Sequence, residues 1–334
     1  MVKPLGEVTT SASKPTKITI KRLVGNAPWS DARRWCVSSV LILAACGGGS
    51  SSGGADTGAT PVVGNDGSPV AFVLISDISY GKTSVNQLDI YQPSDICDVP
   101  RPTVFFVHGG GFRSGDKVGN AVSDRAGASL DNGFNFVSIN YRLEGDNPVL
   151  APEFQAIYDD LAVQDPPSDP DNRNAEIAAI EDSVDALNFL VANADQYCLD
   201  MDRLAYWGSS AGATNVLSLG YRMDQFGIDR PAPDVVINYW GDLRRDEDLH
   251  LMEAPFLTIH GDADSTILYQ VAVDLADQAN AIGVPYAFYT DVNGEHNVDT
   301  EQTVNGVTLL ELTVDFIEAH VIGGMPLYEI ADVD

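Results

Sequence analysis

The chain has 334 residues, of which 44% are apolar and 20% charged, so it has the composition of a soluble globular protein and room for one large domain or two modest ones. Its formal net charge is −29 at pH 7. A field of that sign repels nucleic acid and anionic lipid headgroups, which argues against both as partners.

The first 45 residues have the pattern of a secretory signal peptide. Residues 1–34 hold seven Lys or Arg against two acids, and residues 35–45 form the apolar run WCVSSVLILAA. A membrane-spanning helix needs about 20 apolar residues, so this run is too short for one. A basic segment followed by a short apolar core and small residues is instead typical of an export signal.

The end of this run predicts a lipid anchor. The sequence LAAC, which ends at Cys46, resembles the lipobox of bacterial lipoproteins, in which the cysteine is lipidated and becomes the new N-terminus. Cleavage nearby without lipidation is the alternative. The Gly/Ser-rich residues 46–68 would form a flexible tether. We therefore expect an exported lipoprotein on the periplasmic or cell-surface face, whose only membrane contact is its anchor.

Residues 69–334 show apolar runs typical of strands in alternation with helical patterns. Strands are expected at 70–80, 86–92, 103–107, 134–141, 203–207, 234–240, 255–260 and 285–290, and helices at 174–194, 210–221, 267–282 and 303–320. Residues 144–173, rich in Asp and Pro, are expected to be the least structured part, a surface excursion over one end of the sheet. The alternation predicts one α/β domain, with a mostly parallel central sheet of about eight strands and helices on both faces.

The first candidate functional motif is HGGGF at residues 108–112, directly after an expected buried strand. Consecutive glycines leave backbone N–H groups unobstructed and flexible enough to converge on an oxygen atom. The amides of Gly110 and Gly111, with that of Ala211, would form an oxyanion hole, in which each donor typically contributes about 3–4 kcal/mol of transition-state stabilisation. An ordinary Gly-rich turn is the alternative.

The second motif is G-x-S-x-G within AYWGSSAGATN, residues 205–215, between an expected strand and an expected helix. This is the setting of a nucleophile elbow. Gly208 and Gly212 are then needed because the turn is tight and a side chain would strike the strand or the helix. Ser210 would stand exposed at the helix N-terminus, which favours developing negative charge, whereas Ser209 would face the other way. Ser210 is the predicted nucleophile.

A serine nucleophile needs a general base. His296, in the loop sequence NGEHNV after the last expected strand of the alternation, is the candidate. Structural or solvated positions are expected for the other four histidines, His108, His250, His260 and His320.

The base in turn needs an acid that orients it. The sequence HGDADST, which follows the expected strand at 255–260, offers two aspartates. Asp264 is preferred because it lies further into the loop toward His296. Asp262 is the first alternative, and Asp242, after the preceding strand, is the second.

HGGGF, GSSAG, HGDAD and a late loop histidine, in this order and spacing, resemble the α/β-hydrolase superfamily over roughly residues 70–322. The esterases with an HGGG motif, hormone-sensitive-lipase-like or feruloyl-esterase-like, are the most similar branch. The resemblance implies a serine carboxylic ester hydrolase that acts through an acyl-enzyme on small or short-acyl esters, with Ser210 as nucleophile, Asp264 as acid and His296 as base. Those lipase-like esterases usually carry a helical N-terminal cap, whose place the tether takes here, so their substrate range does not carry over.

Cys97 and Cys198 remain once Cys36 of the signal and the lipidated Cys46 are set aside, and disulfides persist in exported proteins. The strand order of the α/β-hydrolases puts the third and fifth strands side by side. Each cysteine lies five or six residues before one of these strands. The resemblance therefore implies a Cys97–Cys198 disulfide, with two buried free thiols as the alternative.

Two other functions fit parts of the pattern. One is a serine peptidase of the same fold, although such peptidases usually carry a propeller of several hundred residues, for which these 334 residues offer no segment. The other is a non-catalytic surface-binding module, although such modules usually lose a member of the triad, and all three positions are filled here. No cofactor is expected, and solvated acids are expected rather than a metal at the acidic clusters near 242 and 262.

Overall fold

The computed structural model describes residues 62, 70–93, 96–164 and 169–333. The expected signal peptide, Cys46 and all of the expected tether except Val62 lie outside these residues. The strands are β1 (Val73–Ser79), β2 (Gln87–Gln92), β3 (Arg101–Val107), β4 (Asn135–Ile139), β5 (Leu199–Ser209), β6 (Val235–Tyr239), β7 (Phe256–Gly261), β8 (Tyr286–Asp291), β9 (Thr303–Val304), β10 (Val307–Thr308) and β11 (Ile330–Val333). The helices are α1 (Asn120–Asp131), α2 (Pro152–Gln164), α3 (Pro170–Ala192), α4 (Ala211–Tyr221), α5 (Tyr269–Ile282) and α6 (Leu309–Glu318).

Nine of these strands form one sheet, in the order β1-β2-β4-β3-β5-β6-β7-β8-β11. β1 and β2 are antiparallel to their neighbours, whereas every pairing from β4 to β11 is parallel. Because β3 lies between β4 and β5, the third and fifth strands are neighbours, as expected. Parallel strands send their following loops to one edge, so the loops after β3, β5, β7 and β8 can meet there.

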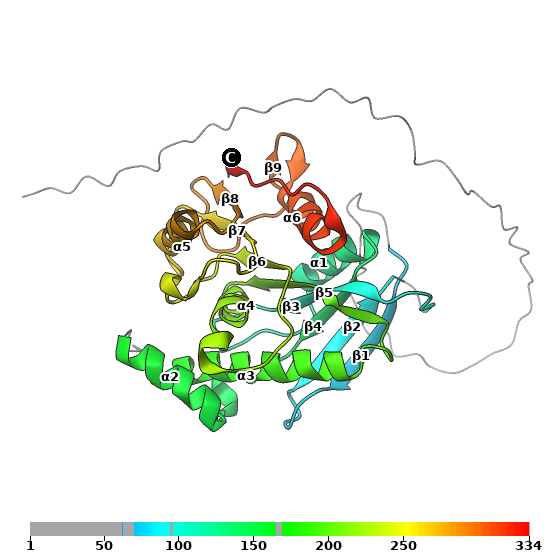
Figure 1. Cartoon of the computed structure of the whole chain (residues 1–334), viewed down its shortest axis with the longest axis vertical. Helices are drawn as coiled ribbons and strands as arrows, with labels where there is room; N and C mark the ends of the chain where they lie inside the picture. Colours follow the sequence, from blue (N-terminus) through cyan, green and yellow to red (C-terminus); the bar gives the residue numbers. More distant parts are fainter. Residues whose placement is uncertain (1–61, 63–69, 94–95, 165–168, 334) are drawn as a thin grey trace, which may run out of the picture. The chain divides into compact units, whose positions relative to one another are not determined.

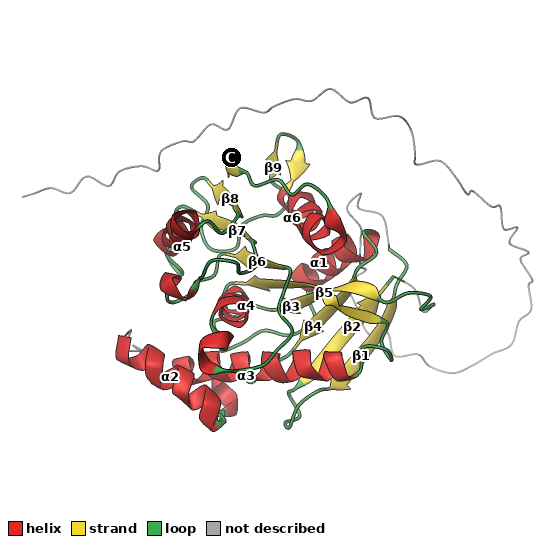
Figure 2. Ribbon diagram, in the orientation of Figure 1, coloured by secondary structure: helices red, strands yellow, loops and turns green. Residues whose placement is uncertain are grey.

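Helices cover both faces of the sheet (Figures 1 and 2). Successive side chains of β3 enter different apolar cores, with Phe105 in one and Phe106 in the other. Side chains of α2, α3, α4 and α5 belong to the core of Phe105, and those of α1 and α6 to the core of Phe106. The mostly parallel sheet with helices on both faces is thus confirmed, with nine strands where about eight were expected.

The expectation for residues 144–173 was wrong in part. The segment contains α2 and the first residues of α3, and both helices begin with a proline at their first position, where its missing N–H costs nothing. Phe154, Ile157 and Leu161 of α2 are buried at helical spacing. The many Asp and Pro residues mask this short apolar face in the sequence.

Other differences concern short or small-residue elements. Residues 303–308 form the hairpin β9–β10 instead of helix, and α6 begins where Thr308 and Glu311 make a reciprocal capping box. Neither α1 nor β11 was predicted. The buried face of α1 is rich in Ala, Gly and Ser, which give a weak helical pattern, and β11 has only four residues.

The predicted disulfide joins Cys97 to Cys198, with the two Cα atoms 5.7 Å apart. The carbonyl of Cys198 also accepts a hydrogen bond of 3.1 Å from the amide of Arg101, the first residue of β3. Cys198 directly precedes β5. The bridge therefore ties together the starts of two neighbouring strands, at the sheet edge opposite the loops that follow them.

Within the ranges that the structure describes, no helix is both long and apolar enough to cross a membrane.

Candidate active site

Ser210 lies on a sharp turn between β5 and α4. Its backbone has φ 54° and ψ −123°, a conformation that L-residues rarely adopt and that is held here because the Ser210 amide donates a 2.8 Å hydrogen bond to the carbonyl of Tyr239. The first residue of α4 is Ala211, so Ser210 precedes the positive end of the helix dipole. This backbone has the geometry that a nucleophile elbow requires.

The glycines of the motif leave room for this turn. A Cβ atom on Gly208 would overlap the carbonyl of Gly212, and one on Gly212 would overlap the carbonyl of Val107. The hydroxyl of Ser209 is buried without a hydrogen-bond partner in the described part of the chain. The steric need for both glycines agrees with the sequence interpretation, and the role of Ser210 as the nucleophile stays a prediction.

Ser210, His296 and Asp264 form one hydrogen-bonded chain. The Oγ of Ser210 lies 2.8 Å from Nε2 of His296, and Nδ1 of His296 lies 2.7 Å from Oδ2 of Asp264. Asp264 follows β7 and His296 follows β8, so three separate loops bring the groups together. The imidazole thus has its two nitrogens on a hydroxyl and a carboxylate, the arrangement that general-base activation of a serine requires.

The carboxylate of Asp264 is fully buried yet held in its ionised form. Burial by itself raises the pKa of Asp264, but the hydrogen bond from His296 and the amides of Thr266 and Ile267 outweigh it, so the pKa lies below its ordinary value. These two amides donate to Oδ1 at 2.8 and 3.0 Å. Asp264 can therefore fix the proton of His296 on Nδ1 and leave Nε2 free to accept from Ser210.

The alternative acids have other partners. Oδ1 of Asp262 accepts a 2.7 Å hydrogen bond from the amide of Asn293, and Asp242 forms a 3.0 Å ion pair with Arg244. The structure thus places Asp264, and neither alternative, against the imidazole of His296.

The other histidines occupy the structural or solvated positions that the sequence predicts. Two of them contact backbone carbonyls: Nδ1 of His108 lies 2.7 Å from the Gly109 oxygen, and Nε2 of His260 lies 2.9 Å from the Ile267 oxygen. His320 packs against the ring of Phe316, and His250 is exposed beside Glu253. One contact was not foreseen. Nε2 of His260 also lies 3.3 Å from Oδ2 of Asp264, and burial lowers the pKa of His260, which favours the neutral ring.

The HGGG loop lies against the elbow. A Cβ atom on Gly109 would stand 2.8 Å from the carbonyl oxygen of Ser209 and 3.1 Å from Cβ of Ser210, so only glycine fits there. Gly110 and Gly111 have φ of 120° and 62° and are exposed. In the described residues no protein group accepts a hydrogen bond from the amides of Gly110, Gly111 or Ala211. These three donors are therefore available to a bound oxygen.

Trp240 is a neighbour of the site that sequence analysis did not single out. It follows β6 with φ 45°, which is unusual for a bulky residue, and its amide donates a 2.8 Å hydrogen bond to the carbonyl of Ile259. Its buried indole lies edge-on to the imidazole of His296, with ring centroids 6.3 Å apart. No sequence motif marks this contact. The only sequence signal is a bulky residue between the end of β6 and Gly241, where a strained turn can occur.

The loop after β6 carries an acid whose protonation changes near neutral pH. Burial, together with the nearby carboxylates of Asp242, Asp274 and Glu247, raises the pKa of Asp246 to about 7. In the unfolded chain an aspartate titrates near 3.9. Between these two values the folded state binds more protons than the unfolded state, so this group destabilises the fold progressively as the pH rises from about 4 to about 7.

We therefore expect Asp246→Asn to raise the melting temperature at pH 8 and to change it little at pH 4. Thermal unfolding across that range measures the difference. Asp229→Asn is the matched control, because it removes the same charge from an exposed aspartate. A gain at pH 8 that Asp229→Asn reproduces would show a general charge effect and contradict the local assignment.

Comparisons with known proteins agree with this architecture. The family model described as BD-FAE matches residues 88–159 and 172–236, which include both glycine motifs and end before Asp264 and His296. No curated protein sequence matches the chain.

Solved structures share the fold at low sequence identity. A truncated carbohydrate esterase from gut microbiota is 16% identical, with a TM-score of 0.56, and the match covers 75% of this chain and 96% of that one. An α/β-hydrolase enzyme from a Medee basin deep-sea metagenome library is 16% identical, with a TM-score of 0.54 and coverage of 76% and 99%. An esterase of the fungus Rhizomucor miehei is 17% identical, with a TM-score of 0.56 and coverage of 75% and 85%.

Proposed function

We propose that this chain, whose fold is that of the α/β-hydrolases, is a serine carboxylic ester hydrolase for small or short-acyl esters. The observation that carries the proposal is the continuous chain from Ser210 Oγ through His296 to the buried, ionised carboxylate of Asp264. The exposed loop of Gly110 and Gly111 beside it supplies free amides for an oxyanion. The carbohydrate esterase from gut microbiota and the Rhizomucor miehei esterase, which share this fold, support the same chemistry.

The geometry supports a two-step reaction. His296 Nε2 takes the proton of Ser210 while Oγ bonds to the ester carbonyl carbon, and the amides of Gly110, Gly111 and Ala211 hold the oxyanion. When this intermediate collapses, the bond to the alkoxy oxygen breaks and the imidazolium gives its proton to the departing alcohol. Water then repeats the sequence on the acyl-enzyme, with His296 as the base, and releases the carboxylic acid.

Hydrolysis of p-nitrophenyl acetate, measured beside hydrolysis of a peptide nitroanilide, tests this function. We expect ester turnover that saturates with substrate and declines as the acyl chain lengthens, with no peptide turnover. Turnover of the anilide would favour the peptidase. If neither substrate is cleaved and a serine-reactive fluorophosphonate does not label the protein, the binding-module alternative replaces the enzyme.

We also propose that the protein is exported and anchored through a lipid on Cys46, a proposal that rests on the LAAC sequence. In a bacterial host, metabolic palmitate should label the protein, which should then partition into the detergent phase of a Triton X-114 extract. Cys46→Ser should abolish the label and move the protein into the aqueous phase. A wild-type protein that already partitions into the aqueous phase would contradict the anchor.

A further inference from the structure

We propose that Asn172 is a positioning residue that holds the oxyanion loop, residues 109–114, in its working conformation. The inference rests on the ester hydrolysis proposed above. Asn172 lies in the first turn of α3, and its side-chain amide donates to the carbonyl of Gly111 at 2.8 Å and to Oε2 of Glu144 at 3.1 Å. One amide group thus joins the helix, the glycine loop and the segment after β4.

The glycine loop needs such a contact because it has little packing of its own. Gly110 and Gly111 adopt positive φ, and a Cβ atom on Gly111 would meet no atom within 4 Å. The amides of Arg113 and Ser114 close the turn on the Gly110 carbonyl, each at 3.1 Å. The bond from Asn172 fixes the next carbonyl. Because glycine peptides rotate easily, this bond limits the directions in which the loop amides can point.

Glu144 holds the following carbonyl. Its backbone amide donates to the carbonyl of Phe112 at 2.8 Å, and its carboxylate receives both Asn172 and, at 2.8 Å, Nε of Arg113. The carbonyls of residues 111 and 112 are therefore fixed in succession. A side chain of α3 holds the first, and the backbone after β4 holds the second.

The start of α3 is itself fixed in the same cluster. Oδ1 of Asp169 caps the helix by accepting from the amide of Asn172 at 3.3 Å, and the other oxygen of Asp169 binds Arg113. Asp169 lies within residues 160–171, between the two segments that the family model matches. Asn172, Gly111 and Glu144 themselves lie within the matched segments, so only the cap of the helix falls outside them.

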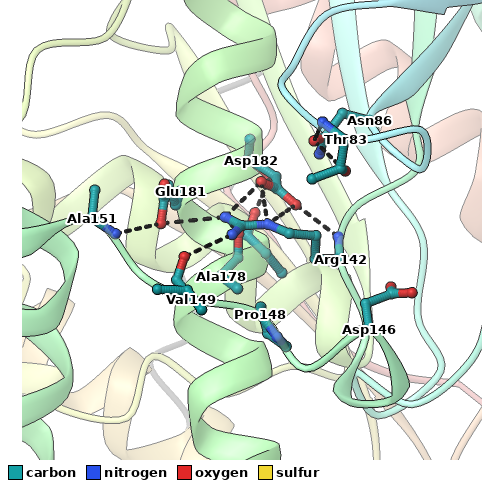
Figure 3. Close-up of polar contacts among 12 residues, drawn as sticks. Thr83, Asn86, Arg142, Asp146, Pro148, Val149, Ala151, Ala178, Glu181 and Asp182 are labelled. Carbon is teal, nitrogen blue, oxygen red and sulfur yellow. Dashed lines mark hydrogen bonds and ion pairs between the residues drawn. The ribbon is translucent and has the colours of Figure 1, made fainter.

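Arg142 fastens the segment that carries Glu144 to the middle of the same helix (Figure 3). Nε and Nη2 of Arg142 each lie 2.8 Å from Oδ1 of Asp182, and the backbone amide of Arg142 donates to Oδ2 of Asp182 at 2.7 Å. Nη2 also lies 3.2 Å from Oε2 of Glu181. The guanidinium also donates to the Val149 carbonyl at 3.0 Å, and Glu181 accepts from the amide of Ala151 at 3.2 Å. Both supports of the oxyanion loop, Asn172 and Glu144, are therefore anchored on α3.

The expected effect falls on transition-state stabilisation, because oxyanion donors act only when they are held in place before the reaction. Displacement of such a group by about 1 Å can lower turnover about 100-fold. Asn172→Ala removes the donor. Asn172→Asp keeps the shape but places a carboxylate against the Gly111 carbonyl and against Glu144, and should therefore be the more damaging change.

The experiment compares Asn172→Ala and Asn172→Asp with Asn174→Ala, all assayed with p-nitrophenyl acetate. Asn174 is the matched control because its side-chain amide also lies in the first turns of α3 and donates to a loop carbonyl, that of Pro148, at 2.7 Å. Active sites are counted with a fluorophosphonate, so that unfolded molecules do not enter the rate. The affinity for phenylboronic acid, which forms a tetrahedral adduct on the serine, reports the oxyanion site directly.

We expect kcat per titrated site to fall roughly 10- to 100-fold in the Asn172 variants, with KM nearly unchanged and the boronate dissociation constant raised by a similar factor. Asn174→Ala should stay within about twofold of wild type on both measures. The inference is overturned if Asn172→Ala keeps wild-type kcat per site and boronate affinity, or if Asn174→Ala loses as much. A wild-type protein without ester turnover or fluorophosphonate labelling is a different result, the failure of the proposed function.

Discussion

Ser210→Ala is expected to lower ester turnover roughly 10⁴- to 10⁶-fold while the fold stays intact. In the proposed reaction this hydroxyl is the attacking group of the first step, and the hydroxyl of the adjacent Ser209 is buried and therefore does not replace it. Alanine carries the same backbone constraint at φ 54° as serine, so the turn itself should be unaffected. Steady-state hydrolysis of p-nitrophenyl acetate measures the loss, and the melting temperature checks the fold.

Substitutions of His296 and Asp264, the hydrogen-bond partners in the same chain, should lower turnover to different extents. His296→Ala should lower turnover about as much, because triad members act as a unit, and Asp264→Asn should be somewhat milder. Ser209→Ala is the matched control, because it removes an adjacent hydroxyl that has no hydrogen-bond partner in the structure that is described, and it should keep near-wild-type turnover. If Ser210→Ala retained more than about a tenth of the wild-type turnover, the nucleophile would have to be sought elsewhere.

The positions of the candidate reacting groups could be predicted because each has a requirement that is visible in the local sequence. The elbow needs small residues where Gly208 and Gly212 stand, and the structure leaves no space there for a Cβ atom. His296 and Asp264 were located by their places after successive strands, since parallel strands direct their following loops to one edge. Their meeting at 2.7 Å depends on the parallel pairing of β7 with β8, which the structure shows and the sequence does not state.

Contacts that depend on the path of a long loop could not be predicted in the same way. Asn172 and Gly111 are separated by 61 residues of sequence. Gly111 belongs to the HGGGF motif, but no sequence pattern pairs it with Asn172. The hydrogen bond from Arg142 to Asp182 spans 40 residues, and no sequence pattern predicts it either. Trp240, whose ring lies edge-on to that of His296, has a positive φ that its residue type disfavours. In each case tertiary packing decides the neighbour.

The second large effect is expected from the loss of the Cys97–Cys198 bridge. The disulfide closes a loop with a sequence separation of 101 residues. In the chain-entropy model a loop of this length stabilises the fold by up to about 4–5 kcal/mol. For a domain of this size, loss of the bridge should lower the melting temperature by up to roughly 10 °C. Thermal unfolding of the double variant Cys97→Ser, Cys198→Ser, in a chain that also carries Cys36→Ser and Cys46→Ser, measures this.

Turnover at 25 °C should change little in the same variant, because the bridge and the reacting groups lie at opposite edges of the sheet. Cys198 precedes β5 and pairs with the start of β3, whereas Ser210 and the glycine loop follow the ends of those strands. A reductant should lower the melting temperature of the bridged protein and leave that of the double variant unchanged, which separates the bridge from other effects of the reductant. In the chain that carries Cys36→Ser and Cys46→Ser but keeps Cys97 and Cys198, two reactive thiols in the denatured, unreduced protein would refute the bridge. A loss of turnover as large as the loss of stability would instead show that the two edges of the sheet are coupled.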